Sequence, residues 1–119
     1  MPEINEKIES QIYGVIFGQA VGDALGFGTE FLSKSQVAQE YPSGLDTYRQ
    51  ITRFQPSQDK GYMLTWSPGD WTDDTDQILC ILDSLLEHHR VDVLDIARRF
   101  HHWAITDGGE VKKGVGELF

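Results

Sequence analysis

The sequence predicts an all-α protein, on two observations. Apolar residues recur at helical spacing in three segments, which run from Ile4 to Leu25, from Thr72 to His89 and from Asp92 to Ala104. No segment shows the sustained alternation of apolar and polar residues that is typical of a β-strand. With 119 residues, of which 39% are hydrophobic and 24% charged, the chain is large enough for one globular domain.

The first predicted helix, from Ile4 to Leu25, contains a series of glycines that needs a reason. Its apolar stripe consists of Ile4, Ile8, Ile12, Val15 and Ile16, and glycine recurs every four residues at Gly14, Gly18, Gly22 and Gly26. Each glycine inside a helix costs about 1 kcal/mol relative to alanine. Close approach of a neighbouring helix would explain the series and is favoured by the spacing. The alternative is that the helix ends near Gly22 and that the backbone turns around a ligand.

A short second helix is predicted from Ser33 to Glu40, because Ser33 and Gln36 have the spacing of a capping box. This helix is ended by Tyr41-Pro42-Ser43-Gly44. From Leu45 to Asp70 the chain is polar and shows little periodicity. A structureless loop of that length is unusual in a compact domain, so the segment either forms a substrate-site loop or contains a short element.

The next helix begins at Thr72, and the acidic residues that follow suit the positive end of a helix dipole. The last helix has Asp92 as its N-cap and is ended by Asp107-Gly108-Gly109. The apolar stripe of the helix that begins at Thr72 consists of Ile78, Leu79, Leu82, Leu85, Leu86 and His89. The apolar stripe of the last helix consists of Val93, Ile96, Ala97, Phe100, Trp103 and Ala104.

Two apolar residues close the sequence, where polar residues are more usual, so we expect the chain to stop partway through a larger fold.

The composition argues against several classes of partner. The net charge of −9, from 19 acidic and 10 basic residues, is unlike that of nucleic-acid-binding domains, which usually carry a basic face. A single cysteine, Cys80, excludes an intrachain disulfide and favours a reducing compartment. The N-terminus has no apolar signal core, and no apolar run approaches the roughly 18 residues that span a membrane. We therefore expect a cytoplasmic protein that binds neither nucleic acid nor membrane.

The strongest candidate site is the segment Asp70-Trp71-Thr72-Asp73-Asp74-Thr75-Asp76, which holds four carboxylates within seven residues. Carboxylates packed together repel one another, and a divalent cation relieves that repulsion. Carboxylate and hydroxyl oxygens are also the ligands that magnesium prefers. The simpler interpretation is that the acids stabilise a helix start, at roughly 0.3–1 kcal/mol each, and local chemistry alone favours it. The segment is not an EF-hand loop, because the required glycine and the terminal glutamate are absent.

Asp23 and Glu30 form a second candidate site. Asp23 is a charged residue inside the small, apolar stretch from Gly22 to Gly26. A buried carboxylate without a partner is costly, so Asp23 should meet a partner, a cation or water. Glu30 follows where the chain has left the predicted helix, and on its own it is better explained as a solvated surface acid.

Other candidates are weaker. The pairs His88-His89 and His101-His102 are neighbours in sequence, and neighbours on a helix point in different directions. A surface pair is therefore favoured over a zinc site at each. Cys80 lies between apolar residues, which favours a buried inert thiol over a nucleophile.

Two motifs resemble those of the ADP-ribosylglycohydrolase family. The first motif resembles the opening helix of that family and consists of Gly14, Gly18-Gln19-Ala20-Val21-Gly22-Asp23-Ala24-Leu25-Gly26 and Glu30-Phe31. The second motif resembles the family's metal-binding motif and consists of Trp71-Thr72-Asp73-Asp74-Thr75-Asp76-Gln77. The two motifs occur in the family's order and at a family-like separation, and the resemblance runs through most of the chain.

The resemblance implies a fold and a metal site. The fold would be a compact, orthogonal all-α bundle that holds two magnesium ions. Thr72, Asp73 and Asp74 would be metal ligands in the first half of that site. Glu30 would lie near the scissile bond and either take part in catalysis or gate the site, and Asp74 would also take part in catalysis. Asp23 would support the metal site without binding the metal itself.

The implied function is magnesium-dependent hydrolysis of the N- or O-glycosidic bond that joins ADP-ribose to a protein side chain or a small molecule. The partner would be ADP-ribose or an ADP-ribosylated protein. The glycine-rich tail resembles a family loop near the ADP-ribose, in which Gly114 and Gly116 would let backbone amides approach the phosphates. A plain flexible tail explains these two glycines equally well.

The chain departs from the family pattern in its length. Family members are usually more than twice as long, and their remaining magnesium ligands come from a C-terminal Asp-x-Asp-Ser/Thr motif that this sequence lacks. Residues 1–119 would therefore be the N-terminal portion of a single domain. Its exposed helix faces would allow self-association. The alternative function is that of a truncated or non-catalytic relative that binds ADP-ribose without activity of its own.

Overall fold

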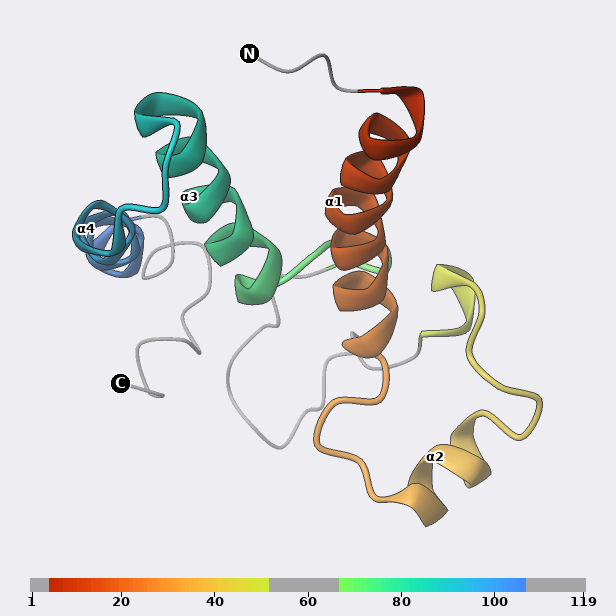
Figure 1. Ribbon diagram of the computed structural model, residues 1–119. Helices are drawn as coiled ribbons and strands as arrows, with labels where there is room; N and C mark the ends of the chain where they lie inside the picture. Colours follow the sequence, from red (N-terminus) through yellow and green to blue (C-terminus); the bar gives the residue numbers. More distant parts are fainter. Residues whose placement is uncertain (1–4, 52–66, 107–119) are drawn as a thin grey trace. The chain divides into compact units, whose positions relative to one another are not determined.

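The computed structural model describes residues 5–51 and 67–106. These ranges contain the α-helices α1 (Glu6–Gly26), α2 (Lys34–Glu40), α3 (Asp73–His88) and α4 (Val93–Ile105), the 3-10 helix η1 (Tyr48–Gln50) and no strand (Figure 1). The prediction of an all-α protein is confirmed. The described residues fall into two compact units, one of residues 5–51 and 67–71 and one of residues 72–106.

The first unit begins with α1, which runs unbroken to Gly26. The Asn5 side chain caps the helix by accepting a hydrogen bond from the Ile8 N–H at 2.9 Å. The alternative that the helix ends near Gly22 is therefore wrong. The Phe27 N–H still donates to the Asp23 carbonyl at 3.0 Å, so the helical hydrogen bonding extends beyond that glycine.

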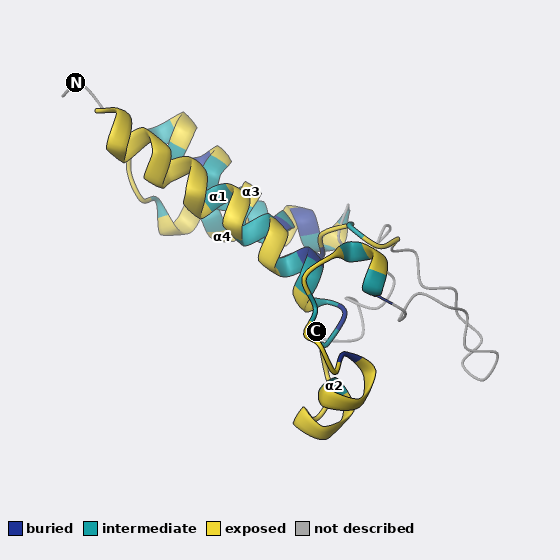
Figure 2. Cartoon of the chain, turned by 90° about the vertical axis from the view of Figure 1, so that its right-hand side faces the viewer, coloured by how far each residue is buried: buried dark blue, intermediate teal, exposed yellow. Residues whose placement is uncertain are grey.

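Most residues of α1 are exposed (Figure 2). Ala24 is buried. The helix carries its glycines at positions where a side chain would fit. A Cβ added at Gly14, Gly18, Gly22 or Gly26 would meet no described atom within 4 Å. Within this unit, no neighbouring helix approaches the glycines among the described residues, so close packing there stays a prediction.

Gly28 fixes the turn that follows α1. A Cβ at this position would lie only 2.9 Å from Leu45 Cδ2 and 3.1 Å from Ile51 Cγ1, so glycine permits this close approach. The Tyr41 hydroxyl donates a hydrogen bond to the Gly28 carbonyl at 3.3 Å. Because Tyr41 and Ile51 are both buried, these contacts form the small core that holds the end of α1 in place.

The second predicted helix is confirmed as α2, together with its capping box. The Gln36 N–H donates to Ser33 Oγ at 3.3 Å, and the Ser33 N–H donates to Gln36 Oε1 at 2.8 Å. Each bond satisfies a backbone donor that the helix itself leaves without an acceptor.

The segment after α2 contains the short element η1, one of the two alternatives that the sequence left open. Gln50 Oε1 accepts hydrogen bonds from the N–H groups of Asp46 at 2.9 Å and Thr47 at 2.8 Å. Gln50 Nε2 donates to the Gly44 carbonyl at 3.1 Å. The Thr47-x-x-Gln50 spacing, which is that of a capping box, was the signal that would have revealed this element.

The second unit is a hairpin in which α3 packs against α4. The joint is formed by His89, whose backbone is left-handed (φ 54°) and whose N–H donates to the Leu85 carbonyl at 2.9 Å. Asp92 caps α4, as predicted, by accepting a hydrogen bond from the Asp95 N–H at 3.0 Å. Ser84 is fully buried.

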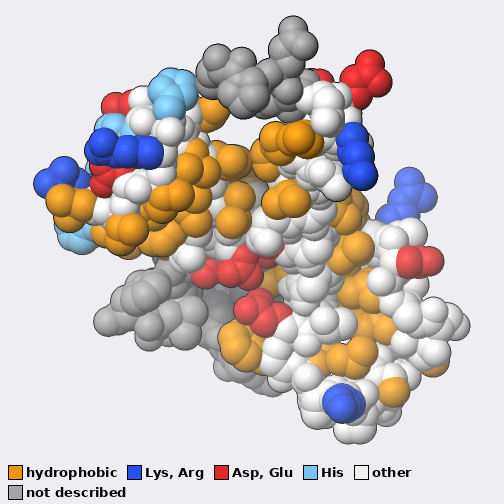
Figure 3. All heavy atoms as spheres, in the orientation of Figure 1, with side chains coloured by type: hydrophobic (Ala, Val, Ile, Leu, Met, Phe, Trp, Pro, Cys, Tyr) orange, Lys and Arg blue, Asp and Glu red, His pale blue; other side chains and the backbone are white. Residues whose placement is uncertain are grey.

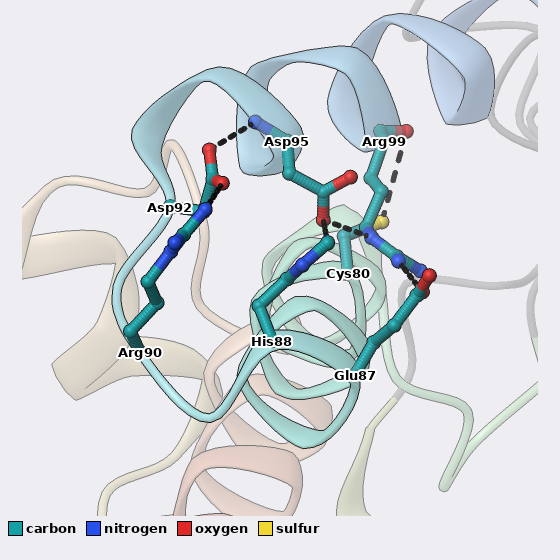
Figure 4. Close-up of polar contacts among 7 residues, drawn as sticks. All are labelled: Cys80, Glu87, His88, Arg90, Asp92, Asp95 and Arg99. Carbon is teal, nitrogen blue, oxygen red and sulfur yellow. Dashed lines mark hydrogen bonds and ion pairs between the residues drawn. The ribbon is translucent and has the colours of Figure 1, made fainter.

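Charged side chains bridge the two helices near the joint (Figure 4). Asp95 Oδ2 accepts a hydrogen bond from Arg99 Nε at 2.7 Å and lies 3.3 Å from His88 Nε2. Arg99 also forms an ion pair with Glu87 on α3. This network places His88 in contact with Asp95 on the neighbouring helix.

Cys80 Sγ lies 4.0 Å from the Arg99 carbonyl oxygen in the same hairpin. Partial burial raises the pKa of its thiol, and the charges of Asp83 and Asp76 act in the same direction. Because the thiolate is the reactive form of cysteine, the raised pKa supports the interpretation of an inert thiol.

Apolar side chains also lie on the surface of this hairpin, where Figure 3 shows them gathered over α3 and α4. The exposed ones are Leu79, Leu86, Val91, Val93, Leu94 and Ile105. The predicted apolar face of the last helix is therefore buried at Trp103 but exposed at Val93. None of the helices in the described ranges has the length and apolar content that crossing a bilayer requires.

Candidate metal and active site

A tight turn leads into the acidic motif. The Ser67 N–H donates to Asp70 Oδ2 at 2.8 Å, and the Asp70 N–H donates to the Ser67 carbonyl at 3.0 Å. Gly69 has a φ of 96°, which favours glycine, and Pro68 precedes it, as in a type II turn. Asp70 thus closes this turn, unlike the three aspartates that follow it in the motif.

Thr72, Asp73 and Asp74 stand together at the start of α3. Thr72 is the N-cap residue, with an extended backbone and only 5% of its surface exposed. Asp73 is half-buried and Asp74 is exposed, both in the first turn. The Thr72 side chain does not make the usual N-cap hydrogen bond, so helix capping does not account for it. One hydroxyl and two carboxylates therefore come from three consecutive residues.

The fourth carboxylate of the motif, Asp76, is bound by α4. Trp103 Nε1 donates a hydrogen bond to Asp76 Oδ2 at 3.1 Å, and Trp103 is 7% exposed. The contact joins the first turn of α3 to the last turn of α4. Sequence reasoning missed it, because residues on separate helices come together only through the packing of the hairpin.

Asp23 and Glu30 lie at the C-terminal end of α1, in the other unit. Asp23 is half-buried on the helix, and Glu30 is exposed in the turn that follows. Phe31, next to Glu30, has a left-handed backbone (φ 63°) and a ring that is 83% exposed. Such backbone conformations are uncommon for bulky residues and tend to cluster at functional sites.

The predicted site residues are thus placed as two groups, with Thr72, Asp73 and Asp74 in one unit and Asp23 and Glu30 in the other. Gly114 and Gly116 lie outside the described residues. In ranges 5–51 and 67–106, no three His, Cys, Asp or Glu side chains gather in a way that could hold a metal ion.

The donors at the start of α3 fit magnesium in their chemistry. Thr72, Asp73 and Asp74 offer only oxygen atoms, which are the ligands that magnesium prefers. Three residues do not complete an octahedral shell, and magnesium usually keeps several waters. Because the N-terminal end of a helix carries a partial positive charge, a cation at this position depends on the two carboxylates.

Comparison with known proteins connects this arrangement to a family. The model of the ADP-ribosylglycohydrolase family matches residues 4–118. The chain is 35% identical over 113 residues to ADP-ribosyl-[dinitrogen reductase] glycohydrolase of Rhodospirillum rubrum, covering 92% of this chain and 35% of that protein. It is 28% identical over 90 residues to ADP-ribosylarginine hydrolase Tri1 of Serratia proteamaculans, covering 76% of this chain and 20% of that protein.

A third relative is an uncharacterized protein of Archaeoglobus fulgidus, 34% identical over 96 residues, with 81% of this chain and 28% of that protein covered. No solved structure matches the chain. The chain thus spans about a third or less of the length of these relatives.

Proposed function

Because the chain belongs to the ADP-ribosylglycohydrolase family, we propose that it forms the N-terminal part of a magnesium-dependent hydrolase that cleaves the glycosidic bond of ADP-ribose. The observation that carries the proposal is the grouping of Thr72, Asp73 and Asp74 at the start of one helix. The oxygen donors alone would not support a metal site, because acids at a helix start are also explained by their interaction with the helix dipole. The proposal therefore combines the donors with the family match.

The substrate class follows from the names of the relatives. One is named for ADP-ribosyl-dinitrogen reductase and another for ADP-ribosylarginine. We therefore propose an ADP-ribosylated protein side chain as the substrate of the complete site. The N-glycosidic bond of ADP-ribosylarginine is the first linkage to test.

Each side chain has a defined task in this proposal. Thr72, Asp73 and Asp74 would hold magnesium through their oxygen atoms. Bound there, the ion would supply a Lewis acid that orients ribose hydroxyls and water. Asp23, half-buried on α1, would support the site without being a ligand.

Glu30 would act on the water that attacks the anomeric carbon. Breaking the glycosidic bond builds positive charge on the ribose ring, which nearby carboxylates stabilise. The exposed Glu30 carboxylate would accept a proton from the attacking water. The electron pair of the broken bond leaves with the arginine nitrogen, which takes up the proton that Glu30 has accepted from the water. Asp74 is the alternative proton acceptor.

The test is calorimetric titration of magnesium, and of ADP-ribose with and without magnesium, into the chain. Asp74→Ala should weaken magnesium binding at least about tenfold, or about 1.4 kcal/mol. Asp83→Ala is the matched control, because Asp83 is an exposed aspartate on the same helix outside the motif. Equal magnesium affinity of the wild type and Asp74→Ala would sink the proposed metal site.

A second candidate function is that of an ADP-ribose-binding relative without activity of its own. The chain covers only 35% of the Rhodospirillum rubrum glycohydrolase. Release of ADP-ribose from ADP-ribosylarginine distinguishes the two. Release that Glu30→Gln abolishes, while binding persists, supports the hydrolase. Binding of ADP-ribose without release supports the second candidate.

A further inference from the structure

Trp103 makes the contact that links the acidic motif to the rest of the hairpin. Its Nε1 donates to Asp76 Oδ2 at 3.1 Å, and the Asp76 N–H donates to the Thr72 carbonyl at 3.3 Å. Asp76 therefore contacts α4 through its side chain and Thr72, the N-cap residue of α3, through its backbone N–H. An indole N–H is a donor only and usually finds a partner when it is buried, and hydrogen bonds to a carboxylate are stronger than neutral ones.

The start of α3 differs from the starts of the other α-helices in the described ranges. Asn5, Ser33 and Asp92 each cap their helix with a side chain that accepts a backbone N–H. Thr72 makes no such bond. The first turn of α3 therefore lacks the side-chain cap that the other three α-helices have. The Trp103–Asp76 bond lies in this first turn.

We propose that Trp103 is a positioning residue, whose indole holds Asp76 against α4 and thereby fixes the turn that carries Thr72, Asp73 and Asp74. The part of this inference that concerns magnesium rests on the proposed function. The bond also assigns different tasks to neighbouring aspartates. Asp76 anchors the turn, whereas Asp73 and Asp74 are the proposed metal ligands.

The geometry explains why an anchor would matter to a metal site. A catalytic or binding group must be held to within about 0.5 Å of its working position. The first turn of a helix frays readily, because its N–H groups have no acceptor within the helix. A turn anchored to a buried side chain on a second helix keeps its ligands in place at a lower entropic cost when the cation binds.

The test compares Trp103→Phe with Phe100→Leu, both on α4. The first variant keeps an aromatic ring and removes the N–H donor, whereas the second reduces the packing of a half-buried ring and leaves the donor intact. Two quantities are measured for each: hydrogen exchange of the Asp76 amide, and magnesium affinity by calorimetry. We expect Trp103→Phe to speed exchange and weaken magnesium binding by about tenfold, while Phe100→Leu, at a similar thermal stability, leaves both near wild type.

Asp76→Asn provides the conservative variant. Its side-chain oxygen still accepts the indole hydrogen bond, so we expect exchange and magnesium affinity between those of the wild type and Trp103→Phe. The chemical shift of the Trp103 indole N–H, assigned from its loss in Trp103→Phe, reports whether the bond persists.

Unchanged exchange of the Asp76 amide in Trp103→Phe would overturn the inference. So would faster exchange with an unchanged magnesium affinity, because the anchor would then serve stability alone. If the wild type binds no magnesium, the proposed function fails at its metal site. The exchange measurement still decides in that case whether Trp103 fixes the turn.

Discussion

Asp95 accepts a hydrogen bond from Arg99 Nε at 2.7 Å and lies 3.3 Å from His88 Nε2 (Figure 4). The hydrogen bond from Arg99 is the largest of the causes that lower the pKa of Asp95 from 3.8 to about 2. Because the folded protein favours the ionised form, Asp95 contributes stability above its unfolded pKa. That contribution is lost as the pH falls from about 4 to about 2.

We therefore predict that Asp95→Asn destabilises the chain at neutral pH and that the difference from the wild type shrinks below about pH 4. The asparagine cannot be ionised, so it lacks the contribution that acid removes from the wild type. Urea unfolding of both proteins between pH 7 and pH 2 measures the effect. Parallel stability curves across that range would show that the ionisation of Asp95 does not matter.

At the residue scale, the sequence predicted the identity and location of the acidic motif but not the tasks within it. Thr72, Asp73 and Asp74 do lie at a helix start, because acidic residues and a hydroxyl are strong local signals there. The separate task of Asp76 depends on Trp103, and the sequence predicted only that Trp103 would lie on the apolar stripe of the last helix. Their bond arises from how α3 and α4 pack, which no spacing within one segment encodes.

At the element scale, the caps explain why most helix boundaries could be predicted. Ser33 and Asp92 begin α2 and α4 through the bonds that their side chains were expected to make. The element η1 has three residues, which is too short for periodicity to reveal. The local signal for it is the Thr47-x-x-Gln50 spacing, and the hydrogen bonds of Gln50 reach back no further than Gly44.

The joint between α3 and α4 supports a prediction at this scale. His89 adopts a left-handed backbone (φ 54°) and is exposed, which costs a non-glycine residue about 1–2 kcal/mol. Glycine avoids this cost but loses roughly 0.5–1 kcal/mol more conformational entropy on folding. His89→Gly should therefore stabilise the chain by about 0.5–1 kcal/mol, measured as a higher urea midpoint at an unchanged slope.

The control for His89→Gly is His101→Gly, because His101 is an exposed histidine inside α4. Glycine in a helix interior is less favourable than histidine, so this variant should destabilise the chain by about 0.5 kcal/mol. A loss of stability in both variants would show that the left-handed joint is not strained by its histidine.

At the scale of the whole molecule, two properties act in opposite directions. The described residues expose large apolar side chains on α1, α3 and α4, among them Phe17, Leu86 and Val93. Exposed apolar surface promotes association. The chain also carries a net charge of −9, and two copies of it repel each other.

We predict that the chain self-associates and that salt strengthens the association. Salt shortens the range of the repulsion, from roughly 10 Å at 0.1 M to roughly 3 Å at 1 M, and leaves the apolar attraction in place. Sedimentation equilibrium at these two ionic strengths measures the dissociation constant. Leu86→Glu with Val93→Glu should weaken association at both, because it places charge on exposed apolar positions of α3 and α4.

Gln11→Glu with Gln39→Glu is the matched control for that double variant. It adds the same two negative charges at exposed polar positions on α1 and α2. If charge alone governs association, both double variants weaken it equally, and salt removes the difference from the wild type in each. If the apolar face of the hairpin is the contact surface, only Leu86→Glu with Val93→Glu remains dissociated at high salt. A chain that stays monomeric at every concentration and ionic strength would contradict the prediction as a whole.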